Sequence, residues 1–127
     1  MSNAAGYDVD FYAWTIEQAG LLRAGWLSEA DIENIAEEID SMGRSEKREL
    51  VNRLTVLLVH LLKWQAQPAF RWNSRRLTIV EQRRRLAKHL KDNPSLRGVL
   101  AEAMATAYEF ALLGARQPRP LNGHFLL

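Results

Sequence analysis

Apolar residues recur at helical spacing along most of this chain, and no segment shows the strict alternation typical of a half-buried strand. The spacing predicts five helices, of which the first lies between an Asp8 or Asp10 cap and Gly25. We therefore expect an all-α fold, a compact and mostly antiparallel bundle of about five helices.

Two further helices are predicted before the first proline. Ser28 with Asp31 three residues later resembles a capping box for the second helix, which Gly43 is expected to break or kink. Ser45 can then cap a third helix that stops before Pro68. Apolar residues cover most of the circumference of this third helix, so we expect it to be the central one.

The last two helices are predicted on either side of an Asn-Pro pair. The fourth runs from about Ser74 or Thr78 to Asp92. Asn93 before a proline is typical of an N-cap followed by proline at the first helical position, so a fifth helix is predicted to about Leu113. This last helix is rich in alanine and therefore thin, which allows close packing.

The length of 127 residues fits a single helical domain over residues 1–127, with a flexible start at 1–6 and a proline-containing tail at 115–127. Cysteine is absent, which excludes disulfides, a thiolate nucleophile and a zinc–thiolate site, and fits a cytoplasmic protein. No apolar run reaches the roughly 18 residues needed to cross a bilayer, so no membrane partner is expected.

The formal net charge of +2 hides a strong separation of charge along the chain. Residues 1–50 carry 4 Lys and Arg against 11 Asp and Glu, whereas residues 51–127 carry 13 against 4. This asymmetry is typical either of an acidic half that folds onto a basic half, which is the safer interpretation, or of a basic surface for a polyanion.

The basic charge is densest in residues 71–91, with eight Lys and Arg against one acid. Clustered arginines beside an indole can hold a phosphate backbone and stack a base. The alternative is a solvated helix face, or neutralisation by the acidic run at 29–40, within the molecule or across a dimer. Trp72 itself is more often a packing lid over a helix end than a stacking platform. The candidate nucleic-acid-binding residues are Arg71, Trp72, Arg75, Arg76, Arg84, Arg85, Lys88 and Lys91.

Several charged residues fall near apolar helix faces and predict an internal polar network. On the third helix Arg53 and His60 lie beside the leucine seam, on the second Glu38 lies near the isoleucine stripe, and on the fourth Arg83 falls on the buried line. Buried charges need partners, so we expect Glu38 to join Arg83 or Arg53 with His60 nearby. The expected network comprises Glu38, Arg53, His60, Glu81 and Arg83.

Two roles remain open for this network. It can fix the register of the helices and do nothing else, which is the simpler interpretation. It can also form a catalytic site in which Glu38 or Glu81 orients His60 as a base. We assign no catalytic residue, no metal ligand and no cofactor, because the sequence has no nucleophile motif, phosphate loop or repeated Glu-x-x-His element.

Six sequence blocks in a fixed order resemble one bacterial family. They are DFYAW at 10–14, ENIAEEI at 33–39, MGRS at 42–45, HLLKWQ at 60–65, TIVEQR at 78–83 and NPSL at 93–96. Over about residues 7–113 the chain is similar to the domain-of-unknown-function family twenty-nine, common in cyanobacteria. The resemblance implies an all-helical fold and a bacterial origin. The family has no established reaction, and nucleic-acid binding has been suggested for it on structural grounds.

The resemblance also bears on particular residues. The family's motif positions include those of Glu38, His60, Trp64, Glu81 and Arg83, which implies that the internal network exists. The chain departs from the family at Ser74-Arg75, where members usually have Ser-Trp, and in its short segment after the last helix.

The sequence thus favours a non-catalytic helical binding module, with nucleic acid as the leading partner through the basic segment. The alternatives are a protein–protein or self-association module, with an acidic protein or a second copy as partner, and a hydrolase built on Glu38, His60 and Glu81. The oligomeric state is open.

Overall fold

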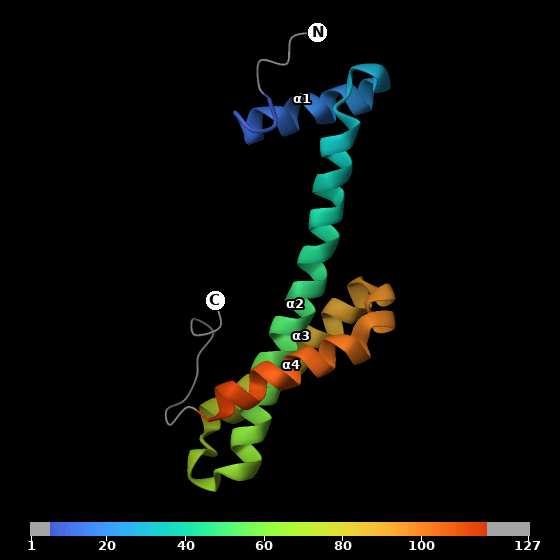
Figure 1. Cartoon of the computed structure of the whole chain (residues 1–127). Helices are drawn as coiled ribbons and strands as arrows, with labels where there is room; N and C mark the ends of the chain where they lie inside the picture. The colour runs from blue at the N-terminus through green and yellow to red at the C-terminus, as the bar shows by residue number, and fades with distance from the viewer. Residues whose placement is uncertain (1–5, 117–127) are drawn as a thin grey trace. The chain divides into compact units, whose positions relative to one another are not determined.

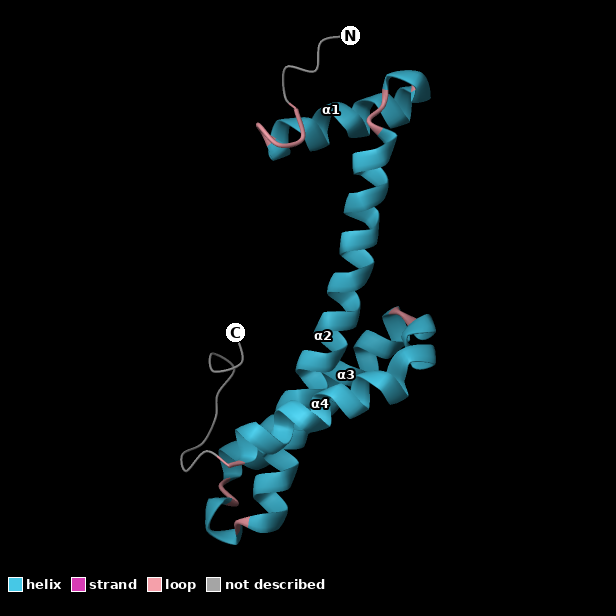
Figure 2. Cartoon of the chain, viewed as in Figure 1, coloured by secondary structure: helices cyan, strands magenta, loops and turns pink. Residues whose placement is uncertain are grey.

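The computed structural model describes residues 6–116, which form helices and connecting turns without any strand (Figures 1 and 2). The prediction of an all-α fold is confirmed. The chain groups into two compact units, one up to Arg44 and the other from Ser45. The expected single domain stays a prediction. The α-helices are α1 (Phe11–Ala24), α2 (Ile32–Ala66), α3 (Asn73–Asp92) and α4 (Leu100–Ala115), and short 3-10 helices occupy Leu27–Glu29, Pro68–Phe70 and Pro94–Val99.

The described residues contain four α-helices rather than five, because α2 runs for 35 residues without interruption through Gly43. The expected break at Gly43 and cap at Ser45 were wrong. Glycine inside a helix costs about 1 kcal/mol relative to alanine but removes no hydrogen bond, so by itself it does not end a helix. Among the described residues only Gly25 has a positive φ.

The boundaries of α1 follow the expected chemistry. Asp10 caps the helix, because its Oδ1 accepts a hydrogen bond of 3.0 Å from the backbone N–H of Ala13. Gly25 ends the helix in the left-handed conformation, with φ 77°, and its N–H donates to the carbonyls of Leu21 and Leu22.

Asp31 joins α1 to the start of α2. Its carboxylate accepts hydrogen bonds from the Asn34 backbone N–H at 3.4 Å and from the Trp14 indole at 3.0 Å. Its own N–H donates to Oε1 of the buried Gln18 at 2.7 Å. Asp31 is therefore the cap of α2, and the predicted capping box was wrong, since Ser28 lies in the preceding 3-10 helix. The side-chain amide of Asn34 also donates to this carboxylate, at 2.9 Å, and this bond is the main reason that the pKa of Asp31 lies below its usual value.

The N-terminal unit has a small interior built on aromatic rings. Tyr7 and Phe11 both pack against Trp14, with ring centroids 4.8 and 5.6 Å from the indole. The Tyr7 hydroxyl donates a hydrogen bond to Glu38 of α2, which raises the pKa of Tyr7 to about 12. Trp14 and Leu21 are the buried hydrophobic side chains among the described residues of this unit.

The C-terminal unit packs the second half of α2 against α3 and α4. Alanines of α4 share one core cluster with leucines of α2, and Ala107 is fully buried. This agrees with the close packing expected for the alanine-rich fifth helix. An exposed ion pair from Lys47 to Glu102, at 3.1 Å, also joins α2 to α4. The main core cluster consists of Leu50, Leu54, Leu57, Ile79, Leu86, Ala103 and Ala107.

The fourth predicted helix begins within one residue of Ser74 and ends at Asp92 as expected, whereas the fifth begins later than expected. Trp72 precedes the first residue of α3, and Asn93 opens a 3-10 helix rather than an α-helix, so α4 begins only at Leu100. Most of the expected flexible start and proline-containing tail lies outside the described residues. No helix in the described part of the chain combines the length and apolar character needed to cross a membrane.

Replacement of Gly43 by alanine should stabilise the protein by about 1 kcal/mol, because a Cβ at this position meets no atom within 4 Å and the helix propensity improves. Replacement of Gly25 by alanine should destabilise it by a similar amount, because a side chain at φ 77° is strained. Urea unfolding of both variants measures the difference. Destabilisation by Gly43→Ala would contradict a helix that is continuous at this residue.

Candidate nucleic-acid interface

The outward face of α3 carries the densest run of exposed cations. Arg84, Lys88 and Lys91 lie within about 60° of one another on the helical wheel, opposite the buried sector of α3. Arg85 lies at the edge of this face. Seven of the eight predicted nucleic-acid-binding residues are exposed, namely Arg71, Trp72, Arg76, Arg84, Arg85, Lys88 and Lys91.

Arg75 is the exception, and its expected place on the binding surface was wrong. Its side chain is 3 % exposed, and its Nη1 lies 3.2 Å from Nδ1 of His60. The guanidinium also lies over the indole of Trp72, 5.7 Å from the ring centroid. Arg75 precedes the buried Ile79 by one helical turn, so it points to the same side of α3.

The start of the basic segment is held against the end of α2. The Nε of Arg71 donates a hydrogen bond of 2.6 Å to the carbonyl of Trp64, and its guanidinium lies 5.8 Å from that ring centroid. Nη2 of Arg76 donates to Asn73 at 3.1 Å. Trp72 is 42 % exposed with Arg75 over its ring, and both expected roles, packing lid and stacking platform, stay open.

The α3 face includes two carboxylates that pair with its cations. Arg85 binds Glu81 and Lys88 binds Asp92, each at 2.7 Å and each one turn apart. Exposed pairs of this kind contribute only about 0.3–0.5 kcal/mol, so a phosphate group can compete for the cations. In residues 45–116 there are 14 Lys and Arg against six Asp and Glu. The potential of this unit is therefore positive.

At the end of α2 and the start of α3, His60, Lys63 and Arg75 form a buried cluster of basic residues, with side chains only 6, 2 and 3 % exposed. Because arginine only donates, Nδ1 of His60 must accept the hydrogen bond from Arg75, which places the histidine proton on Nε2. Burial, followed by the charges of Arg75 and Lys63, lowers the pKa of His60 to about 4. Burial also lowers the pKa of Lys63, with Arg75 as the second cause.

The predicted internal network is divided among separate partners. His60 contacts Arg75, Arg53 binds Glu49 at 3.1 Å, and Glu38 accepts from Tyr7 in the N-terminal unit. The expected links from Glu38 to arginine and histidine are not among these bonds.

Glu81 and Arg83 were expected inside, and both are exposed. The reason is a small rotation of α3. Arg75, Ile79, Leu86 and His89 are its buried residues, and the centre of this sector lies about 75° from Arg83 on the wheel. The prediction from the sequence took the buried line from Ile79, Leu86 and Leu90 alone, and the centre of that line lies closer to Arg83.

Lys63 and His89 are buried residues that the sequence interpretation missed. Lys63 follows Val56 by seven residues and Val59 by four, so the apolar circumference of α2 already included its position. His89 follows Leu86 by three residues, which places it beside a buried leucine. In both cases the neighbouring apolar residues indicate a buried position, although the side chain itself is polar.

His89 lies beside two carboxylates of α2. Its Nδ1 is 3.1 Å from Oε2 of Glu49, and its Nε2 is 3.1 Å from the backbone carbonyl of Glu46. Both ring nitrogens therefore face oxygen atoms of α2. Ligand atoms of Glu46, Glu49 and His89 lie within 4.8 Å of one another, so these three residues could also hold a metal ion. The adjoining pocket of about 360 Å³ is lined by Glu49, Arg53, Arg85, Lys88, His89 and Asp92.

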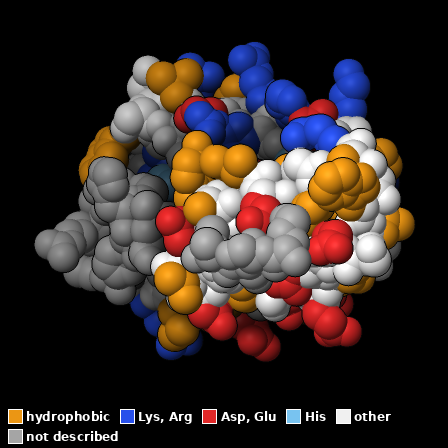
Figure 3. Space-filling view, turned by 90° about the horizontal axis from the view of Figure 1, so that it is seen from above, with side chains coloured by type: hydrophobic (Ala, Val, Ile, Leu, Met, Phe, Trp, Pro, Cys, Tyr) orange, Lys and Arg blue, Asp and Glu red, His pale blue; other side chains and the backbone are white. Residues whose placement is uncertain are grey.

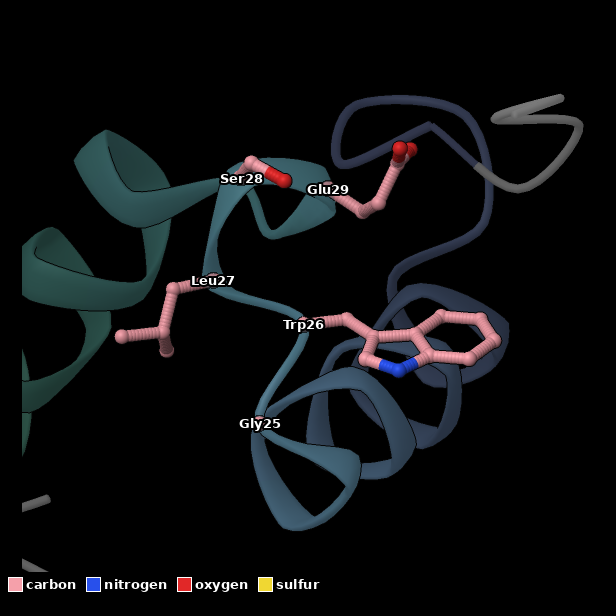
Figure 4. Close-up of a pocket in the computed structure, with 5 residues that line it drawn as sticks. All are labelled: Gly25, Trp26, Leu27, Ser28 and Glu29. Atoms are coloured by element: carbon pink, nitrogen blue, oxygen red, sulfur yellow. The ribbon is translucent and has the colours of Figure 1, made fainter.

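A second pocket, of about 600 Å³, lies where the chain turns from α1 toward α2 (Figure 4). It is lined by residues 25–29. The side chains of Trp26 and Leu27 point in opposite directions, and each is 59 % exposed (Figure 4). Glu29 is the titratable residue of this lining, so the pocket offers no pair of acid and base.

These features define an all-helical protein with an exposed basic face on α3 and a buried cluster of His60, Lys63 and Arg75. The sequence model of the family described as "Domain of unknown function DUF29" matches residues 7–125, and the chain belongs to this family. No curated protein and no solved structure gives a significant match to the chain.

Acidification should destabilise the protein through His60. The unfolded chain binds a proton at this residue below its ordinary pKa of 6.5, whereas the folded chain does so only near pH 4. Stability is therefore lost as the pH falls from about 6.5 to about 4, by up to about 3 kcal/mol. His60→Asn keeps an acceptor for Arg75 but does not titrate, so its urea unfolding should depend less on pH in this window. If the unchanged protein and His60→Asn lost stability equally over this pH range, the loss would not come from His60.

Proposed function

We propose that this protein is a non-catalytic nucleic-acid-binding module, and that the outward face of α3 holds the phosphate backbone. The observation that supports this most directly is the exposed run of Arg84, Lys88 and Lys91, flanked by Arg83 and Arg85. Their spacing along one helix face places several cations within reach of successive phosphates.

Binding of this kind is led by charge rather than by base sequence. No recognition-helix, zinc-finger or RNP pattern accompanies the basic face in the sequence. Trp72, which is 42 % exposed, adds an aromatic ring on which one unpaired base can stack, one helical turn before Arg76. We place this activity in the bacterial cytoplasm and propose no cofactor for it.

A hydrolase built on Glu38, His60 and Glu81 has less support. Glu81 is exposed and paired with Arg85, and His60 is 6 % exposed with a pKa of about 4. A general base works best with a pKa near the operating pH, so this histidine is poorly matched to catalysis at pH 7. The second candidate is a protein–protein or self-association module, which the exposed apolar residues of the N-terminal unit favour.

Fluorescence anisotropy with labelled single- and double-stranded DNA and RNA tests the proposal. We expect micromolar or tighter binding at low salt, with a log–log salt slope of about −0.9 per phosphate neutralised on duplex. Reversal of Arg84, Arg85 and Lys88 to Glu should abolish binding and leave the helical circular-dichroism signal unchanged.

The matched control reverses Arg23, Arg48 and Arg116, which are exposed and lie outside α3. It changes the net charge by the same amount, so it should retain most of the affinity if the α3 face is the site. Equal loss in both triple variants would mean that overall charge, not this face, carries the binding. Affinity that is insensitive to salt would contradict a phosphate-led mechanism.

A further inference from the structure

The N-terminal unit leaves most of its large apolar side chains in solvent. In the described residues up to Arg44, Trp14 and Leu21 are buried, while ten large hydrophobic side chains are at least 41 % exposed. Hydrophobic side chains reach the surface beside Asp and Glu side chains (Figure 3). A unit of this size with so small a core needs a covering partner. The exposed residues are Val9, Phe11, Tyr12, Ile16, Leu22, Trp26, Leu27, Ile32, Ile39 and Met42.

Three of these residues form one stripe on the first half of α2. Ile32, Ile39 and Met42 lie within about 80° on the helical wheel and are 51, 63 and 67 % exposed. Such a stripe is the usual face by which one helix packs on another. Glu38 lies about 40° from Met42 at the edge of the stripe, and Glu46 continues its line one turn beyond Met42, so its surroundings are acidic.

A second apolar stripe is exposed on α4 in the C-terminal unit. Met104, Tyr108 and Leu112 follow one another at intervals of four residues and are 39, 45 and 37 % exposed. The neighbouring face of α4, with Ala103 and Ala107, is already used against α2. The stripe is therefore available to another helix.

The charges of the two units complement each other. Residues 1–44 carry nine Asp and Glu against two Lys and Arg, and residues 45–127 carry six against 15. The acidic unit of one molecule is thus attracted to the basic unit of another. Because the net charge of each molecule is only +2, electrostatic repulsion between two whole molecules is weak. One sequence contains both complementary surfaces, so the fitting partner is a second copy of the chain.

We propose that the protein forms a reciprocal dimer in which the α2 stripe of each copy packs on the α4 stripe of the other. A two-fold axis repeats the same contact twice, so each copy covers both of its stripes at once. This inference goes beyond nucleic-acid binding and does not depend on it.

Sedimentation equilibrium of the full chain at physiological salt is the first test. We expect twice the chain mass of 14.5 kDa. High salt should weaken the dimer, because the two units attract each other electrostatically. A chain that stays monomeric at 100-micromolar order concentrations would overturn the proposal.

Two single variants then test the surfaces. Ile39→Asp and Tyr108→Asp each place a carboxylate in a proposed contact and should weaken the dimer at least tenfold. Phe110→Asp is the matched control, because Phe110 is 56 % exposed and lies about 160° from Tyr108 around α4, so the dimer should persist. Circular-dichroism melting of each variant checks that the fold is retained.

Mixing the two defective variants distinguishes a reciprocal contact from other dimers. In a mixed dimer, one contact contains both substitutions and the other contains neither, so Ile39→Asp and Tyr108→Asp chains should associate more tightly with each other than with themselves. A dimer that joins the N-terminal units to each other would be unaffected by Tyr108→Asp, and that result would overturn the proposal. Loss of the dimer without loss of nucleic-acid binding would separate this inference from the proposed function.

Discussion

The C-terminal unit depends on the close packing of α2 on more than one side. Between Leu50 and Lys63, leucines of α2 contact α3 and the alanine face of α4, while Val59 packs against Ala111 in a separate cluster. A helix enclosed in this way has few positions left for solvated side chains. The polar residues that fall on its other sides, His60 and Lys63, must therefore be accommodated inside.

Burial of His60 and Lys63 explains why one arginine of α3 is buried while others are exposed. Arg75 is turned inward, where it donates to His60 and lies over Trp72. Arg84 is turned outward into solvent. One helix thus supplies both a structural guanidinium, which fixes the end of α2 against the start of α3, and the cations of the proposed binding face. Substitution of these arginines would have different consequences although they belong to the same basic run.

Much of the fold could be predicted from the sequence, and the failures have physical causes. Apolar spacing identified the helices, Asp10 and Gly25 identified the ends of α1, and alanine content identified the close contact of α4. Gly43 misled because a glycine weakens a helix without ending it. Contacts that link distant segments, such as Gln18 with Asp31, leave no periodic signal.

The candidate site was harder to predict, because it depends on the rotation of α3 about its axis. A difference of a few tens of degrees exchanged the roles of Arg75 and Arg83, which sequence spacing alone does not resolve. The inward position of Lys63 was implied by its apolar neighbours Val56 and Val59. A long aliphatic stem let this residue share an apolar face.

The tryptophans are divided evenly between the two units, which gives the protein a built-in optical reporter. Trp14 is buried and bonded to Asp31 in the N-terminal unit, whereas Trp64 and Trp72 each lie under a guanidinium in the other. A cation over an indole changes its electronic surroundings, so the two pairs should differ in emission. Intrinsic fluorescence can therefore follow the opening of each unit without any attached label.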